Sequence, residues 1–209
     1  MSRIEHEPDF EQLLKVLKRQ GRPAHLPIYE HVASPEFISA RTGKPFHEMS
    51  SRDEDYWPTY VDLWLGMGFD CVPMEIPLNC PLPKHDWQGA ASHGSEASVC
   101  IRSWEDFEKY PWPDESRPIE FSHFDVVAEL LPDGAKIVGG VCAGPYEWAS
   151  TMCGVMGLSY MLYDEPDLIT AVFEKVGSLH VAANRQLKTM DAVGALRQGD
   201  DLGFKTSTF

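Results

Sequence analysis

Hydrophobic residues recur along the chain with two periods, one typical of helices and one typical of strands. In residues 9–19 the apolar side chains Phe10, Leu13, Leu14 and Leu17 follow helical spacing, and Asp9 precedes them as a capping residue with Gln12 completing a capping box. Further helices are predicted for 53–67, 118–131 and 165–190, the last capped by Asp164, and strands for 26–32, 69–76, 136–141 and 192–197. Connections that contain helices require parallel pairing, so the pattern predicts an α/β fold.

Residues 135–166 carry the feature around which the other elements are ordered. A short strand breaks at Gly139 and Gly140, and Gly144-Pro145 then begins a long apolar helix. Ligands of parallel α/β sheets bind at the carboxyl ends of the strands, and glycine lets the backbone approach a ligand closely. We therefore predict a substrate site at Gly139, Gly140 and Tyr146. A connection that carries no chemistry fits the same pattern.

Carboxylates follow the last predicted strand directly. Asp200 and Asp201 come after 192–197, and neighbouring residues of an extended segment point in opposite directions, so at most one of them faces a site at the strand end. A carboxyl group in that position supplies a proton or a charge. The alternative is a solvated turn. Glu30 and His31 lie near the end of the predicted strand 26–32, from which they can reach a pocket. The alternative is that they are ordinary polar residues at a strand terminus.

Composition and charge disfavour several classes of protein. The 209 residues include 32 acids and 18 bases, a formal net charge of −14 that disfavours nucleic-acid binding. No apolar run approaches the ~20 residues of a membrane helix, and the first residues lack the pattern of a signal peptide. Five irregularly spaced cysteines are typical of reduced thiols. We expect a soluble, acidic, cytoplasmic protein with no nucleic-acid or membrane partner.

The segment 77–98 has neither helical nor strand periodicity. It and the two residues after it contain side chains of types that bind metals: Cys80, His85, Asp86, His93 and Cys100. None of them forms the close CxxC or HxxxH spacing that indicates a zinc site. Long irregular segments inside a domain are usually functional loops, so a substrate-covering loop is favoured over a metal site.

Three stretches resemble one known family. GGVCAGPYEWASTMCG, MLYDEPDLITAVFEKV and RQGDDLGFKTSTF are similar to the uroporphyrinogen decarboxylase superfamily, which contains the decarboxylase of haem biosynthesis and corrinoid- or zinc-dependent methyltransferases. The resemblance covers about 27–209 and is strongest from Ile137 onward. It implies a (β/α)8 barrel of the TIM type, so residues 1–209 are expected to form one domain that is the N-terminal half of such a barrel, with 1–24 as a helical extension. The open strand edge of a half barrel predicts self-association.

The resemblance favours the methyltransferase branch. The decarboxylase has an arginine-rich loop after its first strand, where this chain has EHVASPEFISARTGKP with Arg41 alone. Its aspartate after the second strand is replaced in CVPMEIPLN, where Glu75 is the nearest acid, and its strand-three tyrosine is replaced near Thr151. Methyl transfer from a corrinoid or another donor to a thiol, complete only in a full barrel, is the expected function. Porphyrinogen decarboxylation and a non-catalytic binding or assembly role are the alternatives.

Residue roles follow from the same comparison. The family's zinc ligands are a His-x-Cys pair and a later Cys, and this chain contains no His-x-Cys. We therefore expect no cofactor or metal in this chain, with zinc and a corrinoid belonging to a full-length relative. Glu75, Asp200 and Asp201 are the predicted catalytic residues, and Gly139, Gly140, Tyr146 and His31 the predicted substrate-binding residues. The expected partner is a small-molecule substrate or a corrinoid protein.

Overall fold

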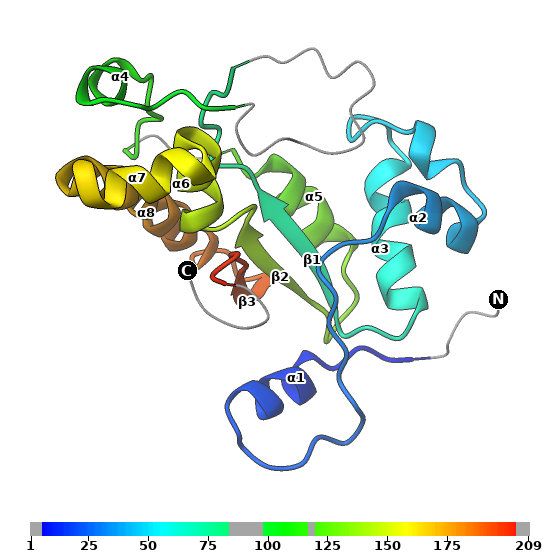
Figure 1. The fold of residues 1–209 in the computed structure, drawn as a ribbon. Helices are drawn as coiled ribbons and strands as arrows, with labels where there is room; N and C mark the ends of the chain where they lie inside the picture. The colour runs from blue at the N-terminus through cyan, green and yellow to red at the C-terminus, as the bar shows by residue number, and fades with distance from the viewer. Residues whose placement is uncertain (1–5, 84–97, 117–119, 204–209) are drawn as a thin grey trace. The chain divides into compact units, whose positions relative to one another are not determined.

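A computed structural model describes residues 6–83, 98–116 and 120–203. Among these residues, eight α-helices, one short 3-10 helix and three strands alternate along the chain (Figure 1). Their bounds are α1 Phe10–Leu17, α2 Pro35–Thr42, η1 Phe46–Glu48, α3 Tyr56–Gly66, β1 Cys71–Ile76, α4 Trp104–Lys109, α5 Ser122–Leu130, β2 Lys136–Val141, α6 Pro145–Cys153, α7 Val155–Asp164, α8 Pro166–Leu187 and β3 Val193–Gln198. None of the helices described has the length and apolar content needed to cross a bilayer.

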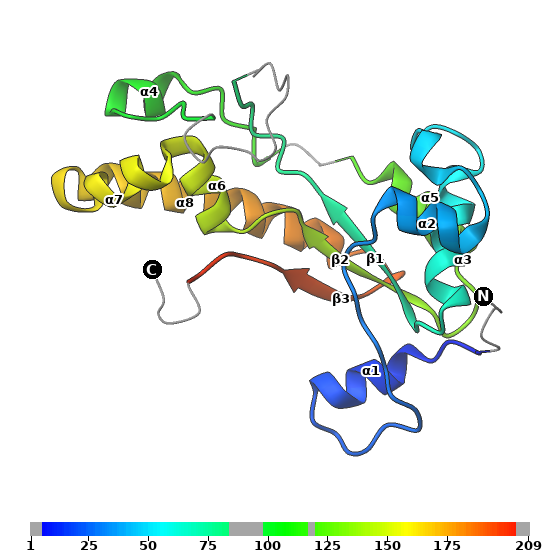
Figure 2. The ribbon, with the colours of Figure 1, turned by 45° about the vertical axis from the view of Figure 1, so that its right-hand side comes forward.

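The strands form one parallel sheet in the order β1-β2-β3, and Figure 2 shows their arrows pointing the same way. This confirms the predicted α/β class and three of the four predicted strands. β1 and the central strand β2 are almost continuously buried, as parallel strands covered on both faces are. β3 differs, because its residues are only half-buried or exposed.

Contacts within the chain divide it into two compact units. Unit 1 comprises 1–74, 120–139 and 187–196, and unit 2 comprises 75–119, 140–186 and 197–209. Each strand therefore begins in unit 1 and ends in unit 2.

The core of unit 1 joins α1 to the beginning of the sheet. Phe10 and Leu13 of α1 pack against Cys71 of β1 and Val138 of β2, as the helical spacing predicted, whereas Leu17 is exposed. Gly194 in β3 leaves the space that the Phe10 ring fills, since a Cβ there would overlap the ring. The predicted capping residue Asp9 accepts a hydrogen bond from the Glu11 N–H. Gln12 donates to the Asp9 carboxylate and does not accept from the Asp9 N–H, as a capping box would require. The Asp9 N–H donates to Asp70 Oδ1.

The helices of unit 2 follow the glycine-rich corner after β2. The predicted long helix from Pro145 is interrupted at Gly154, whose φ of +76° ends α6 and precedes α7. Glycine adopts this torsion without the strain that a Cβ would cause. The following helix α8 buries the apolar stripe that its sequence predicted, including Val172, Val176 and Ala183.

Two further predictions about local structure are wrong. Residues 26–32 form no strand: Pro27 lacks the N–H that a ladder needs, and Leu26 is 82% exposed and Val32 62% exposed. Asp164 does not cap α8, because it is the last residue of α7. The Glu165 carbonyl instead accepts the first hydrogen bonds of α8, from Leu168 and Ile169.

Candidate functional site at the strand ends

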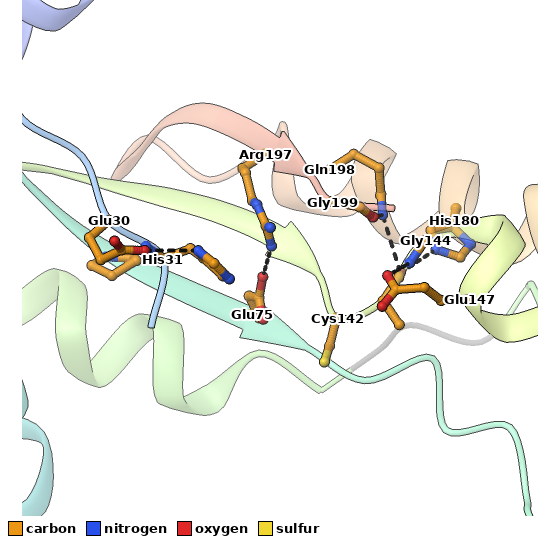
Figure 3. Close-up of polar contacts among 12 residues, drawn as sticks. Glu30, His31, Glu75, Cys142, Gly144, Glu147, His180, Arg197, Gln198 and Gly199 are labelled. Atoms are coloured by element: carbon orange, nitrogen blue, oxygen red, sulfur yellow. Dashed lines mark hydrogen bonds and ion pairs between the residues drawn. The ribbon is translucent and has the colours of Figure 1, made fainter. Parts of the chain in front are cut away.

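An ion pair joins the two outer strands near their carboxyl ends. Arg197 of β3 donates from Nη1 to Oε1 of Glu75 in β1, and Figure 3 shows the two side chains pointing toward one another. Both side chains are about three-quarters buried, and both residues belong to unit 2. β2 lies between these strands, and its Gly140 has no side chain where a Cβ would overlap the Arg197 carbonyl oxygen. Gly140 therefore allows β2 and β3 to approach closely at this site.

Cys142 stands immediately beyond β2, with its sulfur past the strand end in Figure 3. Burial raises the pKa of this thiol, and the negative charges of Glu75 and Glu147 and a hydrogen bond with Glu75 raise it further. The positive charge of Arg197 lowers the pKa of the thiol, but by less than the other contributions raise it. At neutral pH Cys142 is thus a protonated thiol, a poor nucleophile and a hydrogen-bond donor to Glu75.

Asp200 caps the first turn of α6 from outside that helix. Its Oδ2 accepts the Tyr146 N–H at 2.9 Å and its Oδ1 accepts the Glu147 N–H at 3.0 Å. The Glu147 carboxylate in turn accepts the Gly144 N–H at 2.9 Å. A Cβ on Gly144 would overlap the Asp200 side chain, so glycine is required for this contact. Helix N-termini have unpaired N–H groups and a partial positive charge, and both stabilise a carboxylate here.

The connection between β2 and α6 is held in a strained conformation. Ala143 has a φ of +62°, which is uncommon for a residue with a side chain. Its carbonyl oxygen accepts a hydrogen bond from Gln198 Nε2 at 3.2 Å and lies 3.0 Å from Nε2 of the buried His180. The His180 Nδ1 lies 2.9 Å from the Val176 carbonyl, so this histidine packs α8 against the connection, with no substrate-facing nitrogen left.

The structure brings five of the predicted site residues into unit 2. Glu75, Gly140, Tyr146, Asp200 and Asp201 are all in this unit. Asp201 is exposed and donates its N–H to Asp200 Oδ1 at 3.0 Å. Burial first, and then the charges of Asp201 and Asp200, raise the pKa of the Tyr146 hydroxyl, which is therefore a donor at neutral pH.

The other two predicted substrate-binding residues belong to unit 1. His31 contacts its neighbour Glu30, with Nδ1 at 3.0 Å from Glu30 Oε1, in a segment that is not a strand. Gly139 is buried, and a Cβ there would lie 3.3 Å from the Phe124 ring, so its glycine serves packing against α5.

We define the strand-end cluster as Glu75, Cys142, Glu147 and Arg197. Of these four residues, only Glu75 was predicted from the sequence. Arg197 is the last residue of the predicted strand 192–197 and the penultimate residue of β3, and a charged side chain near the carboxyl end of a parallel strand is a signal that could have identified it. Glu147 lies three residues after Gly144, the spacing of a capping box. Cys142 has no comparable pattern.

The ligand types of this cluster do not fit the zinc site of the resembled methyltransferases. The cluster contains two carboxylates, an arginine and one thiol, and its thiol is hydrogen-bonded to Glu75. The other candidate ligands lie between residues 77 and 100, a segment that the structure describes only in part. Cys80 is buried with a pKa raised to about 11 by burial, whereas His85, Asp86 and His93 lie outside the described residues.

A cavity of about 170 Å³ is present in unit 1, lined by residues of α2 and α3 and the turn between α2 and η1. Arg41, Lys44 and Asp62 provide its charged lining, and Leu63 and Met67 part of its apolar lining. It contains none of the predicted site residues.

The raised pKa of Cys142 gives a prediction for its reactivity. Iodoacetamide will alkylate it slowly at neutral pH although the residue is exposed, because the thiolate is the reacting form. Glu75→Gln removes a charge that raises the pKa, so alkylation at a fixed pH is expected to become about threefold faster or more. Timed alkylation followed by peptide mass spectrometry measures the rate, with Cys100 as the internal control. An unchanged Cys142 rate in Glu75→Gln would contradict the contact between the two side chains.

Comparison of the chain with models of known protein families, with curated proteins and with solved structures finds no match.

Proposed function

We propose that the strand-end cluster of unit 2 is the catalytic part of a methyltransferase-like site of the uroporphyrinogen decarboxylase type, which transfers a methyl group to the sulfur of a small thiol. The observation that carries the proposal is the Glu75–Arg197 pair beside the Cys142 thiol, at the ends of adjacent parallel strands. The strand β2, which continues through Gly139 and Gly140 without the predicted break, and the Gly144-Pro145 corner form the rest of this strand end. The resemblance rests in part on both.

Glu75 is the proposed general base. The acceptor thiol replaces the Cys142 thiol as the hydrogen-bond donor to Glu75, and its S–H bond breaks as its sulfur bonds to the methyl carbon. The proton goes to Glu75, and the bonding pair of the broken methyl bond leaves with the donor. Arg197 holds the Glu75 carboxylate in place through the transfer, because a guanidinium remains charged and fixes a carboxylate geometrically. Cys142, protonated at neutral pH, is not the methyl acceptor.

The cluster supports thiol methylation better than porphyrinogen decarboxylation. A substrate with several carboxylates requires several free cationic groups, whereas the arginine of this cluster is already paired with Glu75. No step through zinc is part of the proposal, since the cluster lacks the family's ligand set.

One assay separates the three functions considered. The protein is incubated with methylcobalamin and a panel of small thiols, and thioethers are quantified by mass spectrometry. In parallel it is incubated with uroporphyrinogen, and the decarboxylated products are measured by absorbance after oxidation. We expect thioether formation above the protein-free rate. Decarboxylated product would establish the alternative chemistry, and the absence of both products would favour a binding or assembly role.

We also propose that the sheet belongs to a (β/α) barrel and is extended beside β3 by a second copy of the chain. β3 lies at the edge of the described sheet, is only partly buried and exposes Leu196, unlike the covered strands β1 and β2. Uncovered edges and apolar side chains favour association.

Sedimentation equilibrium tests this association. We expect dimers at micromolar concentration, and Leu196→Lys should weaken the dimer at least about tenfold, because a lysine on an edge strand opposes strand pairing. Val181→Lys is the matched control: Val181 is equally exposed, but on α8, and its replacement should leave the dimer unchanged. A wild-type monomer, or equal effects of the two variants, would contradict pairing through β3.

A further inference from the structure

Asp70 is a buried carboxylate at the start of β1 in unit 1. It is only 1% exposed, and both of its carboxylate oxygens are in contact with imidazole nitrogens. Oδ1 lies 2.8 Å from His6 Nε2, and Oδ2 lies 2.8 Å from His25 Nε2. The three side chains come from separate parts of the sequence that unit 1 brings together.

A buried carboxylate is stabilised by hydrogen bonds and by nearby positive charge, because removal from water disfavours the ionised form. The ion-pair partners of Asp70 are His6 and His25. A cation bound by these three side chains would compensate the charge of the buried carboxylate.

The three side chains have the geometry and chemistry of a metal site. One ligand atom from each of His6, His25 and Asp70 lies within 4.8 Å of the other two. Two imidazole nitrogens and a carboxylate oxygen are a common ligand set for zinc and other first-row divalent ions. Three protein ligands leave a fourth tetrahedral position for water. The His25 side chain is 34% exposed, which gives an ion access from solvent.

Neighbouring groups hold the ligands in place. The Asp9 N–H donates to Asp70 Oδ1 at 2.9 Å, which fixes the orientation of the carboxylate. The buried Gln12 accepts the Ala24 N–H at 2.7 Å and donates to Asp9 Oδ2 at 2.6 Å, so it ties the residue before His25 to the beginning of α1. Such outer contacts orient ligands and raise metal affinity.

We propose that His6, His25 and Asp70 bind one divalent first-row transition-metal ion, with zinc as the physiological ion and water as its fourth ligand. The ion fastens the segment before α1 and the segment after it to the start of β1. This site is separate from the loop residues Cys80 and Cys100 and from the strand-end cluster, and it does not depend on the proposed methyl transfer. No local sequence motif predicts this metal site, because its ligands are separated by 19 and 45 positions in the sequence.

The experiment uses metal-free protein prepared with a chelator. Zinc is titrated by calorimetry, cobalt(II) is titrated by visible absorption, and thermal unfolding is followed with and without zinc. We expect one ion per chain, tetrahedral cobalt bands without thiolate-to-cobalt charge transfer, and a higher melting temperature with zinc, because a ligand that binds the folded state stabilises it.

His25→Gln is the decisive variant. Glutamine still donates a hydrogen bond to Asp70 but is a weak zinc ligand, so the fold is kept while zinc affinity falls at least about tenfold. Asp70→Asn should weaken binding further. His47→Ala, at an exposed histidine of the same unit, is the matched control and should bind zinc as the wild type does.

Three results would overturn the proposal. Absence of stoichiometric binding would leave the three residues as a hydrogen-bonded cluster only. Thiolate-to-cobalt charge transfer would assign the ion to cysteines. Equal affinity of wild type and His25→Gln would exclude His25 as a ligand.

Discussion

Glu75→Gln should lower the rate of thiol methylation by about 10²- to 10⁴-fold, the contribution typical of a positioned general base. Glutamine has nearly the same shape as glutamate and can still accept a hydrogen bond from Arg197, but it cannot take up the proton of the acceptor thiol. The loss is therefore expected in kcat, with a smaller change in KM. Initial rates of thioether formation over a range of thiol concentrations measure both parameters.

Glu115→Gln provides the matched control for this prediction. Glu115 is also a partly buried glutamate of unit 2, and it pairs with Lys175 and Ser178 as Glu75 pairs with Arg197. Loss of that pair should leave methylation unchanged. Equal rates for Glu75→Gln and the wild type would remove Glu75 from the mechanism, and equal losses in the two variants would show that they act only through stability.

Gly140→Ala should destabilise the protein by about 3 kcal/mol, which corresponds to a fall of about 10 °C in the melting temperature for a chain of this size. The added methyl group would overlap the backbone carbonyl oxygen of Arg197 on the neighbouring strand. A backbone atom cannot rotate away as a side chain does, so β2 and β3 have to separate where the Glu75–Arg197 pair forms. Thermal unfolding followed by circular dichroism measures the change.

Gly177→Ala distinguishes this specific overlap from a general sensitivity to glycine replacement. Gly177 lies within α8, and a Cβ there meets no atom within 4 Å. Alanine favours the helix by up to about 1 kcal/mol relative to glycine, so this variant should be as stable as the wild type or more stable. Similar stability of Gly140→Ala and the wild type would mean that the two strands are not as close as the structure has them.

The sequence predicted the elements whose side chains follow a clear period. The stripe of α8 and the apolar runs of β1 and β2 are visible because burial selects every third or fourth residue of a helix and nearly every residue of a covered parallel strand. The segment 26–32 has strand-like composition, but Pro27 and the exposure of Leu26 outweigh it. Composition records which residues suit a strand, and not whether a partner strand is available.

The site was predictable only as far as topology determines it. Parallel strands place their carboxyl ends together, and this predicted a site at Tyr146 and Asp200. Glu75 was predicted only from the family resemblance. The pairing of Glu75 with Arg197 joins residues 122 positions apart and depends on strand order and register, which the sequence does not state. The capping role of Asp200 likewise depends on where α6 begins relative to the end of β3.

Protection of Cys142 by the reaction product tests the central claim most directly, because it asks whether the substrate binds at the strand ends of unit 2. The methyl thioether that the assay identifies is itself inert to iodoacetamide, so it can be present at saturation during alkylation. We predict that it slows alkylation of Cys142 severalfold and leaves that of the half-buried Cys100 unchanged. Unchanged alkylation of Cys142 in the presence of saturating thioether would contradict a site at the strand-end cluster.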